Sequence, residues 1–364
     1  MAQNENEKRT HISDELDNDF EIEYLNEEEN YYTEEDDSEE ETSYSEKPSM
    51  VMHIIFISAI VILLIVAFTK LYSWNKGSAS EYDPNEINTE FDTETEDFYA
   101  SFTPQNLAEQ AADDTTTILL LGNSALTAGE GGIAANLETL IPQSTVYNCG
   151  FNQSYISTRN TIFEYKNPED AYSLYWVANA ITTGDYTLLR DNLNKAPIVD
   201  SLYESTINQL ESIDYSKVDI LVIMYDATDY TDKRLVTSFD NPNEKVAYTG
   251  SLKSSVEMIQ QAYPHIRIII SSPYFIMTQN DNNELASGGE TNFGFGYLPD
   301  YMIAAKNIAT TTLVSYIDNY NGTITTDNYK EYLEADGYTL NSAGQEAIAK
   351  RIATFISPNI SPNK

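Results

Sequence analysis

The chain has 364 residues, with 58 Asp or Glu against 20 Lys or Arg, which gives a formal charge of −38 at pH 7. Residues 115–364 still carry 28 acidic and 15 basic residues, and this balance, without a basic stripe, excludes nucleic acid as an expected partner. The single cysteine, Cys149, excludes an intrachain disulfide. No Cys/His cluster has zinc-ligand spacing, so we expect neither a metal nor a cofactor.

Residues 1–49 form an acidic tail. They hold 19 Asp or Glu and almost no apolar runs, so their charges repel one another and little can be buried. This composition predicts a disordered tail, which we place in the cytoplasm. An alternative is that the tail is the working part of a signalling or scaffold protein.

Residues 50–72 predict one transmembrane helix. Met50–Phe68 is an apolar run without a formal charge, and at about 1.5 Å per residue it covers roughly 28 Å of the bilayer core. The run begins too far from the N-terminus for a cleaved signal peptide, so it indicates a permanent single-pass anchor; a buried core helix is the alternative. Basic residues flank both ends, and charge alone does not set the orientation.

Residues 73–114 follow as an acidic, extracytoplasmic linker. The part from 77 to 114 has 11 acidic residues and no Lys or Arg, which predicts an extended, self-repelling tether. The alternative is that Phe98–Leu107 packs on the following domain as an N-terminal arm.

Residues 115–364 alternate strand-like and helix-like stretches, a pattern typical of an α/β domain with a parallel sheet covered on both faces. Strands are predicted at 118–121, 145–147, 218–225, 266–270 and within 312–317. Helices are predicted at 134–140, 202–212, 252–262, 299–310 and 342–355.

Two long connections interrupt this alternation. Residues 151–201 include an aromatic, helix-like stretch, and long connections near strand ends are often lids or binding loops. Residues 279–296 end in aromatic and glycine residues that could bind a sugar chain, although an ordinary flexible loop is the favoured interpretation.

A turn with a serine follows the first strand, in the sequence Gly122-Asn123-Ser124. Ligands of open α/β sheets bind at the carboxyl ends of the strands, and a serine there can serve as a nucleophile. Ser124 as a simple helix cap is the alternative.

With its motifs in this order, the domain resembles the SGNH (GDSL-type) hydrolases, which are esterases and acyltransferases. Gly122-Asn123-Ser124 stands where the family reads Gly-Asp-Ser, Gly150 follows the second strand, and residues 226–229 and 336–344 match the third and fourth blocks. The resemblance implies a flavodoxin-like three-layer sandwich with a five-stranded parallel sheet. It also implies a nucleophile at Ser124, an oxyanion donor at Gly150 and the acid of a triad at Asp336.

The same comparison shows two departures. The family's asparagine falls on Thr228, and its histidine falls on Thr339. A serine hydroxyl is a poor nucleophile without a neighbouring base. His265, the domain's only histidine, precedes the fourth strand and is expected at the opposite end of the sheet from Ser124.

Two functional hypotheses follow. The first is a catalytically degenerate domain, displayed outside a bacterial membrane, that binds a cell-envelope glycan or a partner enzyme. The alternative is an active serine esterase or O-acyltransferase on acylated envelope polymers, in which Asp226, Asp229, Asp336 or a base from a partner protein replaces the histidine.

Overall fold

The computed structural model describes residues 58, 60–61, 65, 95–101, 115–127, 132–195, 202–280 and 282–357. The chain divides into two compact units, 1–87 and 88–364, and the sheet belongs to the second. None of the helices formed by the described residues is long and apolar enough to cross a bilayer. The predicted tail at 1–49 and the predicted span at 50–72 lie outside the described residues, except for four helical positions of the span, and they stay predictions.

A five-stranded sheet forms the centre of the domain, and all its neighbouring strands run parallel. The order is β2-β1-β3-β4-β7, which is the flavodoxin-like order. The predicted α/β class and five-stranded parallel sheet are therefore confirmed. The strands are β1 (Thr116–Gly122), β2 (Ser144–Gly150), β3 (Ile220–Met224), β4 (Arg267–Ser271) and β7 (Ser315–Ile317).

The apolar runs of the sequence explain which strands are central. Every residue of β1, β3 and β4 is buried, because helices cover both faces of a parallel sheet. β2 is at one edge, and only its last two residues are buried.

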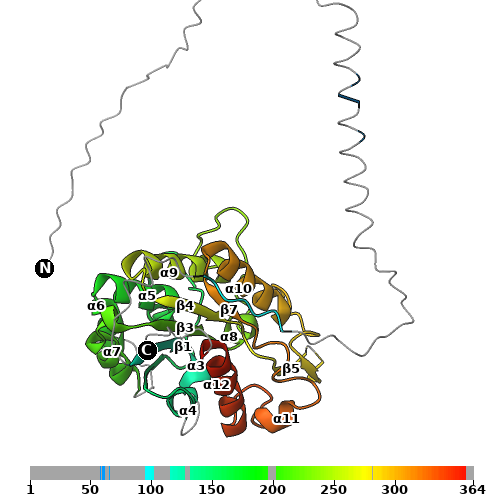
Figure 1. Cartoon of the computed structure of the whole chain (residues 1–364). Helices are drawn as coiled ribbons and strands as arrows, with labels where there is room; N and C mark the ends of the chain where they lie inside the picture. Colours follow the sequence, from blue (N-terminus) through cyan, green and yellow to red (C-terminus); the bar gives the residue numbers. More distant parts are fainter. Residues whose placement is uncertain are drawn as a thin grey trace, which may run out of the picture. The chain divides into compact units, whose positions relative to one another are not determined.

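Helices form a layer on each face of the sheet (Figure 1). On one face α4 (Ile133–Leu140) packs against α12 (Ser342–Ile356), and on the other α9 (Tyr248–Ala262) packs against both α5 (Leu174–Thr183) and α10 (Leu298–Thr312). The side chain of Asn341 accepts the backbone N–H of Gly344 and so caps α12. The remaining helical elements are α3 (Ser124–Thr127), η1 (Pro168–Tyr172), α6 (Thr187–Lys195), α7 (Leu202–Ser212), η2 (Tyr215–Lys217), α8 (Thr228–Thr231) and α11 (Tyr329–Tyr332).

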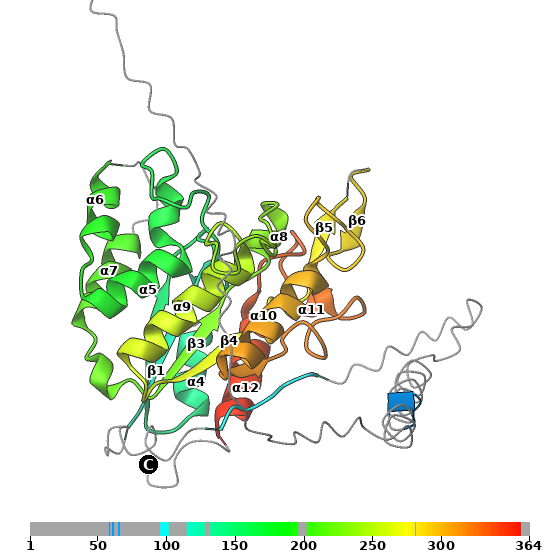
Figure 2. The same ribbon diagram turned by 90° about the horizontal axis from the view of Figure 1, so that it is seen from above.

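The two long connections are more ordered than the sequence indicates. The first contains η1, α5 and α6. The second overlaps a hairpin of β5 (Met277–Gln279) and β6 (Leu285–Ser287), so its interpretation as an ordinary flexible loop is wrong for the hairpin strands. Figure 2 shows this hairpin at the same end of the sheet as α8, which follows β3.

An N-terminal arm, residues 95–101, belongs to the domain. Phe98 and Tyr316 exchange backbone hydrogen bonds of 3.1 and 2.9 Å in an antiparallel bridge beside β7. Arg351 of α12 donates to both carboxylate oxygens of Asp97, at 2.7 and 2.8 Å. The domain therefore begins within the predicted linker, as the alternative of an N-terminal arm anticipates.

Candidate active site

The carboxyl ends of three adjacent strands are level with one another. Gly122 at the end of β1 pairs with Gly150 of β2 on one side and with Met224 of β3 on the other. The residues after these strands consequently meet at one edge of the sheet. The fourth motif reaches the same place, because the Tyr338 hydroxyl lies 2.9 Å from the Thr228 hydroxyl.

Ser124 lies at this edge, at the first residue of α3. Its hydroxyl donates to the side-chain oxygen of Asn152 at 3.0 Å and accepts the backbone N–H of Gln153 at 3.0 Å. Asn152 is itself held by Tyr203, whose hydroxyl donates to the Asn152 carbonyl. The side-chain partner of the serine is therefore an amide, which does not accept a proton near neutral pH.

Gly150 does not supply the expected N–H beside Ser124. Its N–H donates to the side-chain oxygen of Asn148 at 3.3 Å. A Cβ at this position would lie 2.9 Å from the Leu126 Cβ, so the glycine is required by the close packing of α3 on β2. The N–H that faces the Ser124 hydroxyl is that of Gln153, and the oxyanion role of Gly150 stays a prediction.

Gln153 has a left-handed backbone, with φ of 56°, a conformation that glycine adopts most readily. Its side chain is exposed, so little packing offsets the strain. We expect Gln153→Gly to leave the free energy of unfolding, and with it the melting temperature, unchanged or to raise that free energy by up to about 1 kcal/mol. Gly150→Ala should lower the melting temperature. A loss of more than about 1 kcal/mol in Gln153→Gly, measured by thermal circular dichroism, would mean that the glutamine side chain holds the loop.

A buried polar cluster lies directly behind the serine turn. One oxygen of Asp226 accepts from the Asn123 amide at 2.8 Å, from the Tyr338 hydroxyl at 2.8 Å and from the N–H and hydroxyl of Thr228. The other oxygen has no partner in the described part of the chain. Burial raises the pKa of Asp226, and the hydrogen bonds from Thr228, Tyr338 and Asn123 oppose that rise.

This cluster orients the turn rather than the serine hydroxyl. Asn123 is fully buried, and its side-chain oxygen also accepts the backbone N–H of Asp226 at 3.1 Å. Asp226 makes no hydrogen bond to Ser124 within the described residues. Thr228, where the family has asparagine, is part of the same cluster.

Asp229 points to a different loop. Its carboxylate accepts the backbone N–H groups of Ile156 and Ser157, at 2.8 and 3.0 Å, and the Ser157 hydroxyl. Burial raises its pKa, while these hydrogen bonds oppose the shift. Asp226 and Asp229 are thus buried in separate networks.

Asp336 closes a turn on its own segment. It accepts the backbone N–H groups of Tyr338 and Thr339, at 2.8 and 2.9 Å, and the Thr339 hydroxyl at 2.7 Å. Burial acts to raise its pKa, but these hydrogen bonds outweigh it and hold the pKa below the usual value. Thr339 therefore contacts the acid of the motif as a histidine would, but it brings no base.

His265 lies where the sequence predicts. It precedes β4, whereas Ser124 follows β1, and the strands are parallel, so the two residues are at opposite ends of the sheet. One ring nitrogen lies 3.1 Å from the carbonyl oxygen of Tyr215. The histidine is too far away to activate the serine.

Comparison with known proteins gives likenesses only among solved structures. No family model and no curated protein sequence matches the chain. Similar structures include a protein from Lactobacillus plantarum, at 14% identity over 68% of this chain and 99% of that one, with a TM-score of 0.45. A lipase/acylhydrolase from Enterococcus faecalis is 15% identical over 69% and 100%, with a TM-score of 0.38. Est24, a carbohydrate acetylesterase from Sinorhizobium meliloti, is 12% identical over 67% and 99%, with a TM-score of 0.38.

The strand order and the convergence of the four motif segments at one edge agree with the resemblance found in the sequence. The domain has an SGNH/GDSL-type hydrolase fold. Within this SGNH-type site, sequence reasoning missed three residues: Asn152, Gln153 and Tyr338. Neither the side-chain amide of Asn152 nor the backbone N–H of Gln153 carries a catalytic signature in a sequence, and only the position of Tyr338 inside the fourth motif could have pointed to it.

Proposed function

We propose that the chain is a single-pass membrane protein of a bacterial cell envelope, with a cytoplasmic N-terminus and a catalytically degenerate SGNH-type domain outside. In this proposal the domain binds a cell-envelope glycan or a partner enzyme. The apolar run at 50–72 supports the anchor. The absence of disulfides from a large exported domain supports a bacterial source.

One observation carries the proposal of degeneracy: the Ser124 hydroxyl donates to the amide oxygen of Asn152. A serine nucleophile needs a base that takes its proton. The position of the family's histidine is occupied by Thr339, which bonds to Asp336 instead. Ser124 and Asp336 keep the serine and the acid of the motifs, while the group that would activate the serine is missing.

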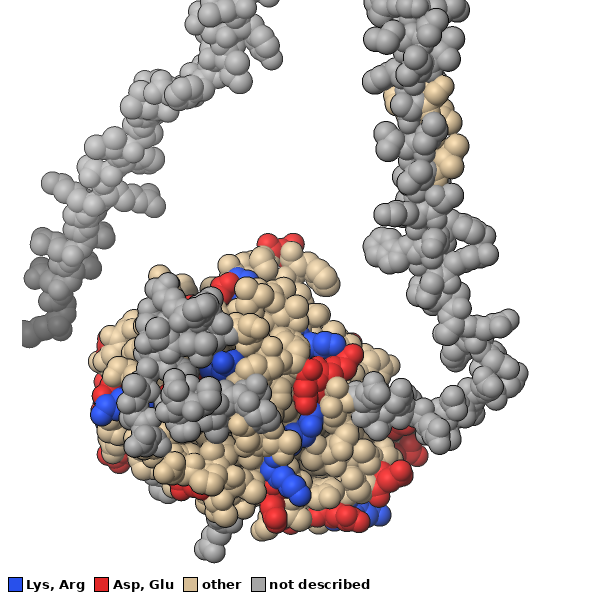
Figure 3. Space-filling view, in the orientation of Figure 1, with Lys and Arg blue, Asp and Glu red and all other residues tan. Residues whose placement is uncertain are grey.

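The partner classes follow from the charge of the domain. Figure 3 shows acidic and basic side chains interspersed over the visible face of the domain, without a broad basic patch. A polyanion such as nucleic acid would gain little from such a surface. A neutral glycan or a protein partner is compatible with it.

An active esterase or O-acyltransferase is the second candidate, favoured by the position of Ser124 directly after β1, at the edge of the sheet where ligands of open α/β folds bind. Asp226, Asp229 and Asp336 are each engaged elsewhere, so none of them replaces the histidine in this geometry. The base would therefore have to come from a partner protein.

Labelling with a fluorophosphonate tests the proposal. We expect the purified full-length chain to react no faster than its Ser124→Ala variant, because the unactivated serine is a weak nucleophile. A serine protease in the same tube controls for the reagent. Rapid labelling that disappears in Ser124→Ala would show an active site and overturn the proposed degeneracy.

A further inference from the structure

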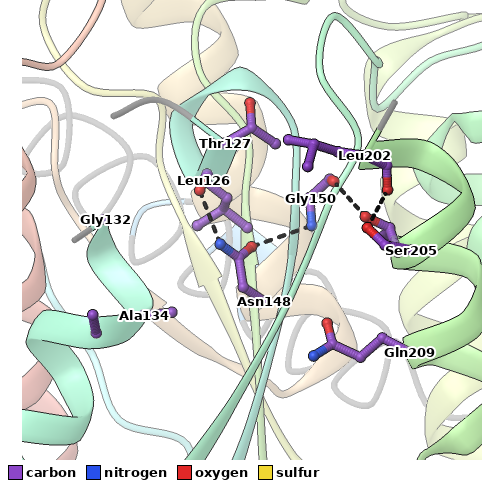
Figure 4. Close-up of a pocket in the computed structure, with 11 residues that line it drawn as sticks. Leu126, Thr127, Gly132, Ala134, Asn148, Gly150, Leu202, Ser205 and Gln209 are labelled. Carbon is purple, nitrogen blue, oxygen red and sulfur yellow. Dashed lines mark hydrogen bonds between the residues drawn. The ribbon is translucent and has the colours of Figure 1, made fainter. Parts of the chain in front are cut away.

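A cavity of about 410 Å³ opens at the edge of the sheet, next to the serine turn but separate from it. Its described walls come from α3, the first turn of α4, the edge strand β2 and α7 (Figure 4). Ser124 does not line it, although Leu126 and Thr127 of the same short helix do. The volume falls within the range of small-molecule sites in proteins.

The walls combine small apolar and neutral polar groups. The described lining contains no charged side chain, in a domain that is strongly acidic. Leu126, Ala134 and Leu202 supply apolar surface, while Thr206 and Gln209 supply polar groups. Such a site favours an uncharged ligand with a small apolar part and a few hydrogen-bonding atoms.

The hydrogen bonds show how the two amide side chains of the wall are held. The Asn148 amide is held against the wall, because it donates to the Leu126 carbonyl at 3.0 Å and accepts the Gly150 N–H at 3.3 Å. The Gln209 side-chain oxygen accepts the Cys149 thiol at 3.3 Å, which holds the amide in place. The Gln209 amide nitrogen has no partner in the described part of the chain, so it can donate to a carbonyl of a ligand.

We propose that this cavity binds the acyl group of a neutral acylated sugar, of the N-acetylhexosamine type. The acyl carbonyl accepts from the Gln209 amide, and the acyl methyl group packs against Leu126 and Ala134. The inference rests on the proposed binding of an envelope glycan, and it adds the chemical class of the ligand and a place for it. Binding here needs no reaction at Ser124.

Calorimetry on the full-length chain in detergent tests the inference, with chitotetraose as the probe and cellotetraose as its counterpart without acyl groups. We expect chitotetraose to bind at least 10-fold more tightly than cellotetraose. Ala134→Leu, which fills the cavity, should weaken chitotetraose binding at least 10-fold. Gln209→Ala should weaken it about 2- to 10-fold, the size expected for one hydrogen bond.

Leu313→Ser is the matched control, since Leu313 is 79% exposed and follows α10, far in the fold from α4 and α7. The Leu313→Ser variant should bind chitotetraose as tightly as the wild type does. Circular dichroism should show that every variant is folded. No binding of chitotetraose, or binding unchanged by both Ala134→Leu and Gln209→Ala, would overturn the inference. Binding lost in Ser124→Ala but kept in Ala134→Leu would also overturn it, and would leave the proposed glycan-binding function standing with the serine cleft as the site.

Discussion

Thr339→His should make the chain react with fluorophosphonates. Thr339 occupies the position of the family's histidine, and its hydroxyl already lies 2.7 Å from an Asp336 oxygen. An imidazole at this position has the acid of the motif as its partner and can serve as the base that Ser124 lacks. Positioned general bases contribute about 10²- to 10⁴-fold, so we expect the labelling rate to rise by about that factor.

The pH profile and two further variants identify the cause of such a gain. Labelling of Thr339→His should increase as the pH passes through the imidazole range near 6.5, because only the neutral ring accepts a proton. It should disappear in Thr339→His with Ser124→Ala and fall in Thr339→His with Asp336→Ala. Thr339→Asn, which adds a polar side chain without a base, should leave the wild-type rate unchanged. No gain in Thr339→His would show that position 339 does not reach the serine.

The fold could be predicted because its signals are local and strong. Apolar runs bounded by turn residues indicate β1, β3 and β4, since a strand buried on both faces tolerates few polar residues. The predicted ends of these strands differ by a few residues from the ends in the structure. The sequence does not decide whether the arm at 95–101 packs on the domain, because an acidic stretch gives no sign that Arg351 will pair with Asp97.

The site could be predicted in outline but not in detail. The resemblance locates Ser124, Asp226, Thr228 and the 336–339 turn, and the structure brings these segments together. It does not locate Gln153, whose backbone N–H reaches the serine oxygen because the chain bends back toward the serine three residues after Gly150.

Burial explains why the sequence does not distinguish the two acids that follow β3. A carboxylate in a sequence shows neither its burial nor its partners, so Asp226 and Asp229 look equivalent there as substitute bases. In the structure each is buried and held by its own donors. Retention of a motif residue can therefore reflect the stability of the turn as well as former chemistry.

Gly122 illustrates this second role, and Gly122→Ala should severely destabilise the domain. A Cβ at Gly122 would lie 2.0 Å from the Met224 carbonyl oxygen and 2.8 Å from the Leu126 side chain. Met224 is part of the central strand β3, which pairs with β1 at this level, so its backbone cannot move without breaking the sheet. We expect a loss of more than about 4 kcal/mol, which is a large fraction of the stability of an ordinary domain.

Gly184→Ala separates the steric effect from the loss of glycine flexibility. Gly184 follows α5 with φ of 69°, and a Cβ added there would meet no atom within 4 Å, so alanine should cost only about 1 kcal/mol. In thermal melts followed by circular dichroism this is about 2–4 °C for a domain of this size, whereas Gly122→Ala should lose more than about 10 °C or fail to fold. Equal melting temperatures for the two variants would mean that β3 yields at Met224. In that case the sheet would not require a glycine at position 122, and only the serine site would. The expected difference between the two variants shows instead that the sheet requires Gly122, whether or not Ser124 is ever activated.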